Sequence, residues 1–134
     1  MSPALVLYVA LGGAAGSALR YLLTYFIQSR QVSVFPTATL LINVVGSILL
    51  GLIMRVSADS AAMNAEVRLL LTTGFCGGFT TFSTFSYETA RLYQDGDYQR
   101  AALYAVLSLA LCIVGVFVGF ALGRVLFALR RGAL

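Results

Sequence analysis

The amino-acid sequence predicts an all-α membrane protein with four transmembrane helices, of which the third is broken. Hydrophobic residues occupy 60% of the 134 positions and charged residues only 10%, whereas soluble domains carry about 25% charged residues. The mean hydropathy is +0.91. Short polar turns divide the chain into four apolar stretches, and a glycine-rich motif interrupts the third. This length suits about four spans of roughly 20 residues each, so we expect residues 1–134 to form a single transmembrane domain.

The charged and sulfur-containing residues disfavour several classes of protein. The basic side chains are all arginines, scattered singly near the ends of the apolar stretches, which favours anchoring at the lipid interface over binding of nucleic acid. The chain has no histidine, and its two cysteines lie inside apolar stretches, so disulfide, zinc and redox-metal sites have no support. It also lacks a nucleotide-binding loop, a catalytic triad and paired catalytic carboxylates, which argues against an enzyme.

The first apolar stretch predicts a helix over about residues 4–27. Gly12, Gly16 and Arg20 recur at intervals of four, so one face is small and ends in a cation. This face can pack against another helix while the arginine extends toward the interface. Alternatively, Arg20 lies in a wet vestibule and concentrates anions there. No basic start typical of a signal peptide precedes the stretch, so we expect it to be retained as a helix.

Pro36 stands near the start of the second predicted helix, about residues 36–54. Thr39 and Asn43 are four residues apart and share a face of this helix. An unpaired amide in hydrocarbon is costly, so Asn43 must have a partner. That partner is either a group on a neighbouring helix or a permeating ion, and the two can coexist.

After a predicted loop at 55–66, the third helix covers about residues 67–93. Unbroken, it would be about 40 Å long, more than the roughly 30 Å of the hydrocarbon core. The motif at 73–86 lies at its centre, with three glycines followed by alternating threonine, serine and phenylalanine. Because Gly-Gly weakens a helix, we predict a break near Gly77 and Gly78. Irregular backbone at this depth must be buried in protein or line an aqueous path.

Such a break would produce two half-helices with opposite preferences for ions. The first ends in free carbonyls, which suit a small cation, and the second begins with free N–H groups, which suit an anion. Hydroxyls after the break can donate to an anion or cap the second half-helix; they belong to Thr80, Thr81, Ser83 and Thr84. Phe82 and Phe85 are three apart, and their ring edges could hold an anion weakly. Core packing is the alternative for both rings.

The fourth predicted helix, about residues 98–129, follows a tight Asp-Gly turn. Tyr104, Ser108 and Cys112 recur every four residues along it, and Gly115, Gly119 and Gly123 continue the same spacing. The glycines favour close approach of another helix, and the polar run either joins that interface or forms a track for a solute. With four spans, one side of the membrane holds five arginines and the other four. This near-tie permits insertion in both orientations.

Three motifs together resemble the Fluc (CrcB) family of fluoride channels over almost the whole chain. They are GGAAG at 12–16 followed by RY at 20–21, TLLIN at 39–43 followed by Gly46 and Gly51, and GFCGGFTTFSTFS at 74–86. The resemblance implies a fluoride-selective channel of the cell membrane that exports F⁻ passively down its gradient. It also implies an antiparallel, dual-topology homodimer with two pores.

The resemblance further implies roles for individual residues. Phe82 and Phe85 would form an aromatic box, and Asn43 would donate to the ion. Tyr104, Ser108 and Thr39 would line a polar track in which Cys112 replaces a hydroxyl. Backbone carbonyls of Gly77 and Thr80 would enclose a structural Na⁺ at the dimer interface, and Arg20 would lie in the vestibule.

Two other functions compete with a fluoride channel at this point. One is a small dual-topology exporter of the multidrug type, which relies on an acidic residue in its first helix. The first stretch here has no acidic residue, and Glu88 lies near the end of the third, where we predict a local pair with Arg91. The other is a non-transporting membrane scaffold that uses its glycine faces for assembly.

Overall fold

The computed structural model describes residues 3–30, 34–59 and 63–132, and within these ranges it is built from helices. The elements are α1 (Pro3–Gln28), α2 (Thr37–Asp59), α3 (Ala65–Leu69), the π-helix η1 (Leu70–Cys76), α4 (Gly77–Phe79), α5 (Phe82–Gln94) and α6 (Tyr98–Gly132). Elements α3, η1 and α4 follow one another directly and form the first half of the third span, and α5 forms the second half. The all-helical, four-span fold with a broken third helix is therefore confirmed.

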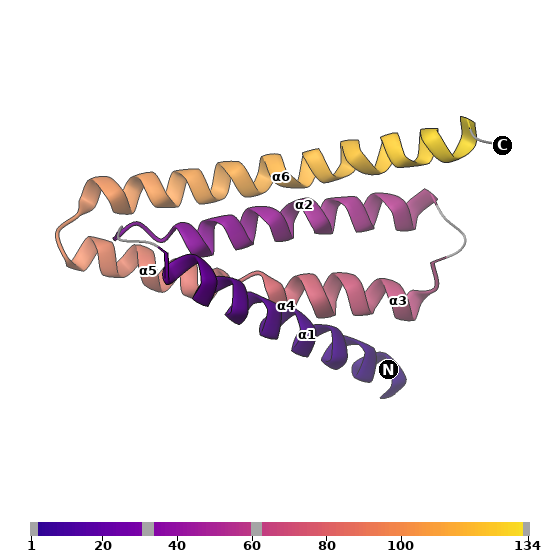
Figure 1. Cartoon of the computed structure of the whole chain (residues 1–134), viewed down its shortest axis with the longest axis horizontal. Helices are drawn as coiled ribbons and strands as arrows, with labels where there is room; N and C mark the ends of the chain where they lie inside the picture. The colour runs from indigo at the N-terminus through magenta and orange to yellow at the C-terminus, as the bar shows by residue number, and fades with distance from the viewer. Residues whose placement is uncertain (1–2, 31–33, 60–62, 133–134) are drawn as a thin grey trace.

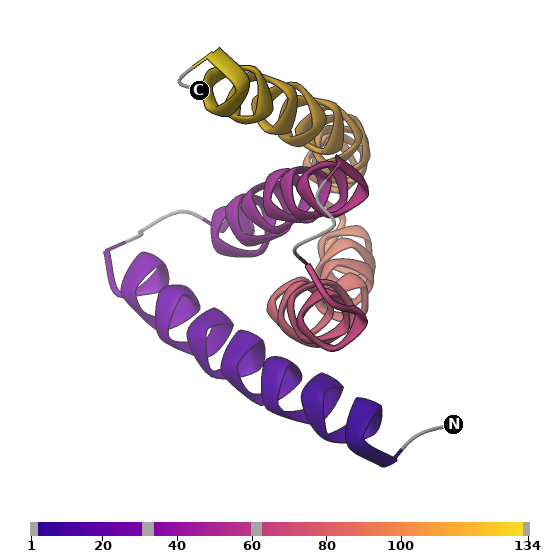
Figure 2. The same ribbon diagram turned by 90° about the vertical axis from the view of Figure 1, so that its right-hand side faces the viewer.

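The spans run up and down, so that the start of α1 and the end of α6 lie at the same end of the molecule (Figure 1). Helix α2 lies between α6 and the broken span, and α1 crosses the broken span obliquely on the side away from α6 (Figure 2). In the described part of the chain, α1, α2 and α6 are long and apolar enough to cross a membrane. The third span is not among them because its break leaves two shorter helices.

Rows of glycine explain why the helices lie so close together. A Cβ added to Gly119 of α6 would overlap the Ile48 carbonyl of α2, and one added to Gly51 of α2 would overlap the Val116 carbonyl of α6. On the other side, a Cβ at Gly16 of α1 would overlap the Phe75 carbonyl of η1. The prediction that the glycines permit close approach of another helix is thus confirmed.

The second helix extends beyond the predicted end at Met54 and continues to Asp59. It continues because α6 is long enough to pack beside it: the Cβ and Cγ atoms of Arg55 lie against Gly123. Asn64 then starts α3 by accepting a hydrogen bond from the Val67 N–H at 2.9 Å. The predicted loop at 55–66 is correspondingly shorter.

The break in the third span lies three residues beyond the predicted position. Gly77 is helical, with φ −64° and ψ −38°, whereas Thr80 and Thr81 are extended, with ψ of 159° and 110°. Gly78 serves close packing instead, because a Cβ there would lie 2.5 Å from the Gly13 carbonyl oxygen of α1. The turn into α6 is as predicted, with Gly96 at φ +81°.

Candidate functional site

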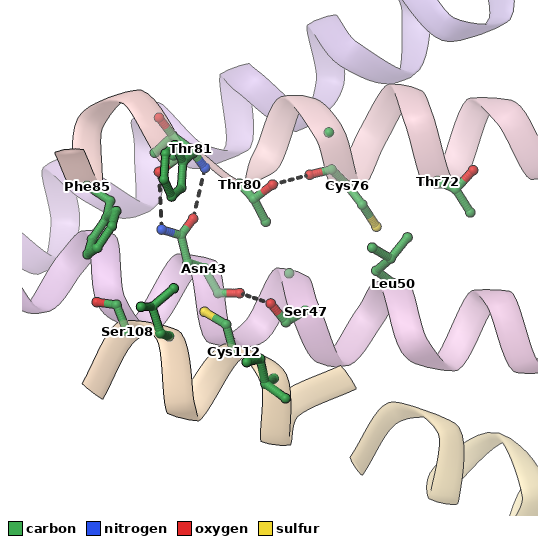
Figure 3. A pocket seen from close by; sticks show the side chains of 15 residues that line it. Asn43, Ser47, Leu50, Thr72, Cys76, Thr80, Thr81, Phe85, Ser108 and Cys112 are labelled. Atoms are coloured by element: carbon green, nitrogen blue, oxygen red, sulfur yellow. Dashed lines mark hydrogen bonds between the residues drawn. The ribbon is translucent and has the colours of Figure 1, made fainter. Parts of the chain in front are cut away.

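Asn43 replaces the helical hydrogen bond that the Thr81 N–H loses at the break. In a continuous helix the Thr81 N–H would donate to the Gly77 carbonyl, but here it donates to Asn43 Oδ1 at 2.8 Å. Asn43 Nδ2 in turn donates to the Thr81 carbonyl at 3.2 Å (Figure 3). The predicted helix-to-helix partner of Asn43 is thus found, and this bond uses one of the two N–H groups on Nδ2.

We expect Asn43→Ala to destabilise the protein by roughly 1–3 kcal/mol, because it leaves the partly buried Thr81 N–H without a partner. Ser47→Ala is the matched control on the same helix. The Ser47 hydroxyl donates only to the Asn43 carbonyl, at 2.7 Å, and that carbonyl is already within a helix. Thermal unfolding of both variants in detergent tests this, and equal shifts in melting temperature would contradict the role given to Asn43.

The Thr81 hydroxyl caps α5, whereas the Thr80 hydroxyl donates back to the Cys76 carbonyl at 2.9 Å. Thr81 Oγ1 accepts from the Thr84 N–H at 3.2 Å and donates to Thr84 Oγ1 at 2.9 Å. It also lies 3.3 Å from the Ser83 hydroxyl. Of the two functions predicted for these hydroxyls, the structure therefore shows the cap for Thr81.

The carbonyl of Gly78 is satisfied by α1. In a continuous helix it would accept from Phe82 N–H; here it accepts from Ser17 Oγ at 3.3 Å and from Arg20 Nε at 3.1 Å. Arg20 therefore lies beside the break and lines a cavity of about 320 Å³ between α1, α2 and α5.

The carbonyls of Gly77 and Thr80 lose their usual helical donors. The Thr81 N–H donates to Asn43, and the Thr84 N–H donates to the Thr81 side chain. A carbonyl released in this way at the end of a helical segment carries partial negative charge. The two carbonyls that the family resemblance assigns to a cation are thus released by the break.

A cavity of about 340 Å³ opens where α2, η1, α4, α5 and α6 meet at the break (Figure 3). Seven of the predicted site residues line it: Asn43, Gly77, Thr80, Phe82, Phe85, Ser108 and Cys112. Phe82 is 73% exposed and Phe85 only 9%, and the centroids of their rings lie 5.5 Å apart. Ser108 is 5% exposed, and its hydroxyl has no hydrogen-bond partner among the described residues.

Tyr104 and Thr39 lie beyond Phe85, away from this cavity. The rings of Phe85 and Tyr104 have centroids 5.3 Å apart, so the polar run on α6 continues past the aromatic pair. Tyr104 donates to Glu88 Oε2 at 2.7 Å and Thr39 to Glu88 Oε1 at 2.9 Å. Tyr104 is fully buried and Thr39 is 4% exposed.

Glu88 is the site residue that the sequence reasoning missed. The predicted pair with Arg91 is wrong, because Arg91 Nε lies 3.9 Å from Asp95 Oδ2 while both Glu88 oxygens accept from other helices. Glu88 lies three residues after Phe85 on the same helix, and this spacing is the signal that could have placed it near the aromatic pair. Glu88 also lines the 320 Å³ cavity beside Arg20 and a further cavity of about 330 Å³ at the start of α2.

Comparison with known proteins shows which family the chain is similar to. Residues 7–120 match the family described as CrcB-like protein, Camphor Resistance (CrcB). A fluoride-specific ion channel FluC of Geobacter sulfurreducens is 46% identical over 119 residues, covering 89% of this chain and 96% of the relative. A protein of the same name from Thermus thermophilus is 48% identical and covers 90% and 94%, and one from Clostridium novyi is 42% identical and covers 92% and 96%.

Proposed function

The chain belongs to the CrcB family of fluoride-specific ion channels, and we propose that it lets fluoride leave the cytoplasm passively through the cavity at the broken helix. It is a multi-pass membrane protein and an ion channel, not an enzyme. Export down the electrochemical gradient would lower the cytoplasmic fluoride concentration. We place the protein in the cell membrane on this basis.

One observation carries the proposed path: the cavity joins aromatic edges, an amide and an unpartnered buried hydroxyl. Phe82 and Phe85 offer ring edges with positive quadrupole, Asn43 has a second amide N–H, and the Ser108 hydroxyl is free to donate. Among the described residues that line the cavity, none is charged. A site without a fixed cation holds an anion weakly, and weak holding is what conduction requires.

The path would continue along α6 past the aromatic pair. Cys112 and Ser108 lie on one face, and Tyr104 follows one turn farther on. Tyr104 and Thr39 direct their hydroxyls at Glu88, so they can donate to a passing fluoride only by exchanging those bonds. Arg20 would attract the anion on the α1 side of the break, and Ser83 and Thr84 would contribute hydroxyls beside the aromatic pair.

Electrogenicity distinguishes this channel from a proton-coupled exporter of the multidrug type. Liposomes loaded with potassium fluoride should release fluoride only when valinomycin provides a path for K⁺, and dissipating a proton gradient should not change the rate. Release that requires a proton gradient would favour the exporter. Absence of release under all conditions would favour a scaffold.

We further propose that two chains pair antiparallel and form two pores. The near-equal split of arginines between the two sides supports insertion in both orientations. The 73% exposure of Phe82 supports a partner beside the aromatic pair, since the single chain leaves this ring uncovered. Mass measurement of the detergent-solubilised protein should give two chains per particle, and a monomer would contradict the proposal.

A structural Na⁺ at the dimer interface would be held by the carbonyls of Gly77 and Thr80 from both chains. Oxygen ligands suit a hard cation, and these carbonyls have lost their helical donors. Replacing Na⁺ with N-methylglucamine in all buffers should weaken the dimer or slow fluoride efflux, because that cation is too large for a carbonyl cage. Unchanged dimer mass together with unchanged efflux would contradict the proposed Na⁺ site.

A further inference from the structure

Both cysteines face the cavity at the break, from different helices. Cys112 projects from α6 and is partly exposed, whereas Cys76 belongs to η1 and is 2% exposed. Both are free thiols. One turn before Cys112, Ser108 is 95% buried, and its buried hydroxyl lacks a partner among the described residues. Figure 3 shows Ser108 and Cys112 together on the wall that α6 contributes.

This arrangement offers a soft ligand on the α6 wall of the cavity, on a different segment from the Gly77 and Thr80 carbonyls that suit a hard cation. Beside Cys112, a hydrated Na⁺ or Mg²⁺ would lose water while meeting apolar side chains such as Leu109 and Ile113. A thiolate instead selects soft metal ions such as Cu⁺, and Ag⁺ shares that preference. When Ag⁺ binds, the S–H bond breaks, an S–Ag bond forms and the proton passes to water. The product is neutral, so it adds no net charge to the cavity.

We propose that Cys112 binds a soft monovalent metal cation and that this binding blocks the passage of fluoride. The unpartnered Ser108 hydroxyl adds a weak oxygen ligand one turn away. Cys76 is the lesser target because its side chain is covered. The blocking effect rests on the proposed function, since a metal atom on Cys112 would occupy the track between the aromatic pair and the glycine face of α6. The metal site itself does not depend on conduction.

The test uses silver nitrate on protein reconstituted into chloride-free liposomes, since silver fluoride is soluble and silver chloride is not. Bound silver per chain is measured after free silver is removed, and fluoride efflux is measured on the same samples. Cys112→Ser and Cys76→Ser are the matched variants, and each is compared with its own silver-free rate. We expect the wild-type protein and Cys76→Ser to bind silver and lose most of their efflux, with recovery on adding dithiothreitol. Cys112→Ser should bind one silver fewer per chain than the wild-type protein, and its efflux with silver should equal its own efflux without silver.

Three results would overturn the proposal. Equal silver binding by Cys112→Ser and the wild-type protein would place the metal elsewhere. Silver bound at Cys112 with undiminished efflux would refute the block. Equal loss of efflux in Cys112→Ser would move the block to another site. If no sample conducts fluoride even without silver, the proposed function fails, and the silver count still decides whether Cys112 is the metal site.

Discussion

Phe82→Ile and Phe85→Ile should each reduce fluoride efflux to the level of protein-free liposomes. Isoleucine keeps the site apolar but removes the ring edge whose positive quadrupole attracts the anion. The two rings form one pair, with centroids 5.5 Å apart at the break. Loss of either ring therefore removes half of the aromatic pair that the ion must pass, although the Asn43 and Ser108 donors remain.

The two variants should differ in their free energy of unfolding. A loss of efflux in the more stable variant then cannot be attributed to unfolding. Phe82 is 73% exposed, so its replacement should change the free energy of unfolding by no more than about 0.5 kcal/mol. Phe85 is 9% exposed and packs on Tyr104, so its replacement by the smaller isoleucine should cost roughly 1–3 kcal/mol. Fluoride-electrode traces and thermal unfolding are measured on both.

Phe117→Ile is the control for the aromatic pair. Phe117 is 66% exposed on α6 and does not line the cavity at the break, so this variant should conduct like the wild-type protein. Normal efflux from Phe82→Ile or Phe85→Ile would show that the ring concerned only packs. A comparable loss in Phe117→Ile would show that the aromatic effect is not local.

Gly16→Ala should destabilise the fold by roughly 1–3 kcal/mol, as overpacking does. A Cβ at this position would overlap the Phe75 carbonyl and lie 2.8 Å from the Phe79 backbone nitrogen. Because both obstacles are backbone, α1 and the broken span must separate. That movement would also disturb the bonds from Ser17 and Arg20 to Gly78, so efflux should fall as well.

Gly13→Ala is the matched substitution three residues earlier on the same helix. Its Cβ would lie 3.8 Å from the Gly74 carbonyl oxygen, which is ordinary contact. Alanine is favoured over glycine in a helix by about 1 kcal/mol, so this variant should be as stable as the wild-type protein or more so. Melting temperatures followed by circular dichroism in detergent compare the two. Similar melting temperatures for both variants would contradict the packing described for α1.

The spans and the glycine faces could be predicted because their signals are local. Apolar length predicts a membrane helix, and the fourfold spacing of Gly115, Gly119 and Gly123 predicts a face that another helix can approach. The position of the break could not be read in the same way. A pair of glycines can indicate either a break in the helix or close packing with another helix. At Gly78 the structure shows close packing, against Gly13. The break is fixed by a bond from Asn43 to Thr81, 38 residues apart.

The residues of the candidate site could be predicted from the sequence, but which of them share a cavity could not. Asn43, Phe82 and Ser108 stand out as polar or aromatic residues at regular helical spacing, yet only tertiary packing brings them to one cavity. Helical spacing predicts a pair between Glu88 and Arg91, because opposite charges three residues apart are favourable within a helix. Its actual partners, Thr39 and Tyr104, lie on two other helices, and their positions depend on how α2 and α6 pack against α5.

The most direct test of the fluoride channel is ion release from liposomes that contain only the purified protein. Matched liposomes are loaded with potassium fluoride or potassium chloride, efflux is started with valinomycin, and each anion is followed with its own electrode. We expect rapid release of fluoride and retention of chloride. No release of fluoride, or release of chloride at the same rate, would contradict the account.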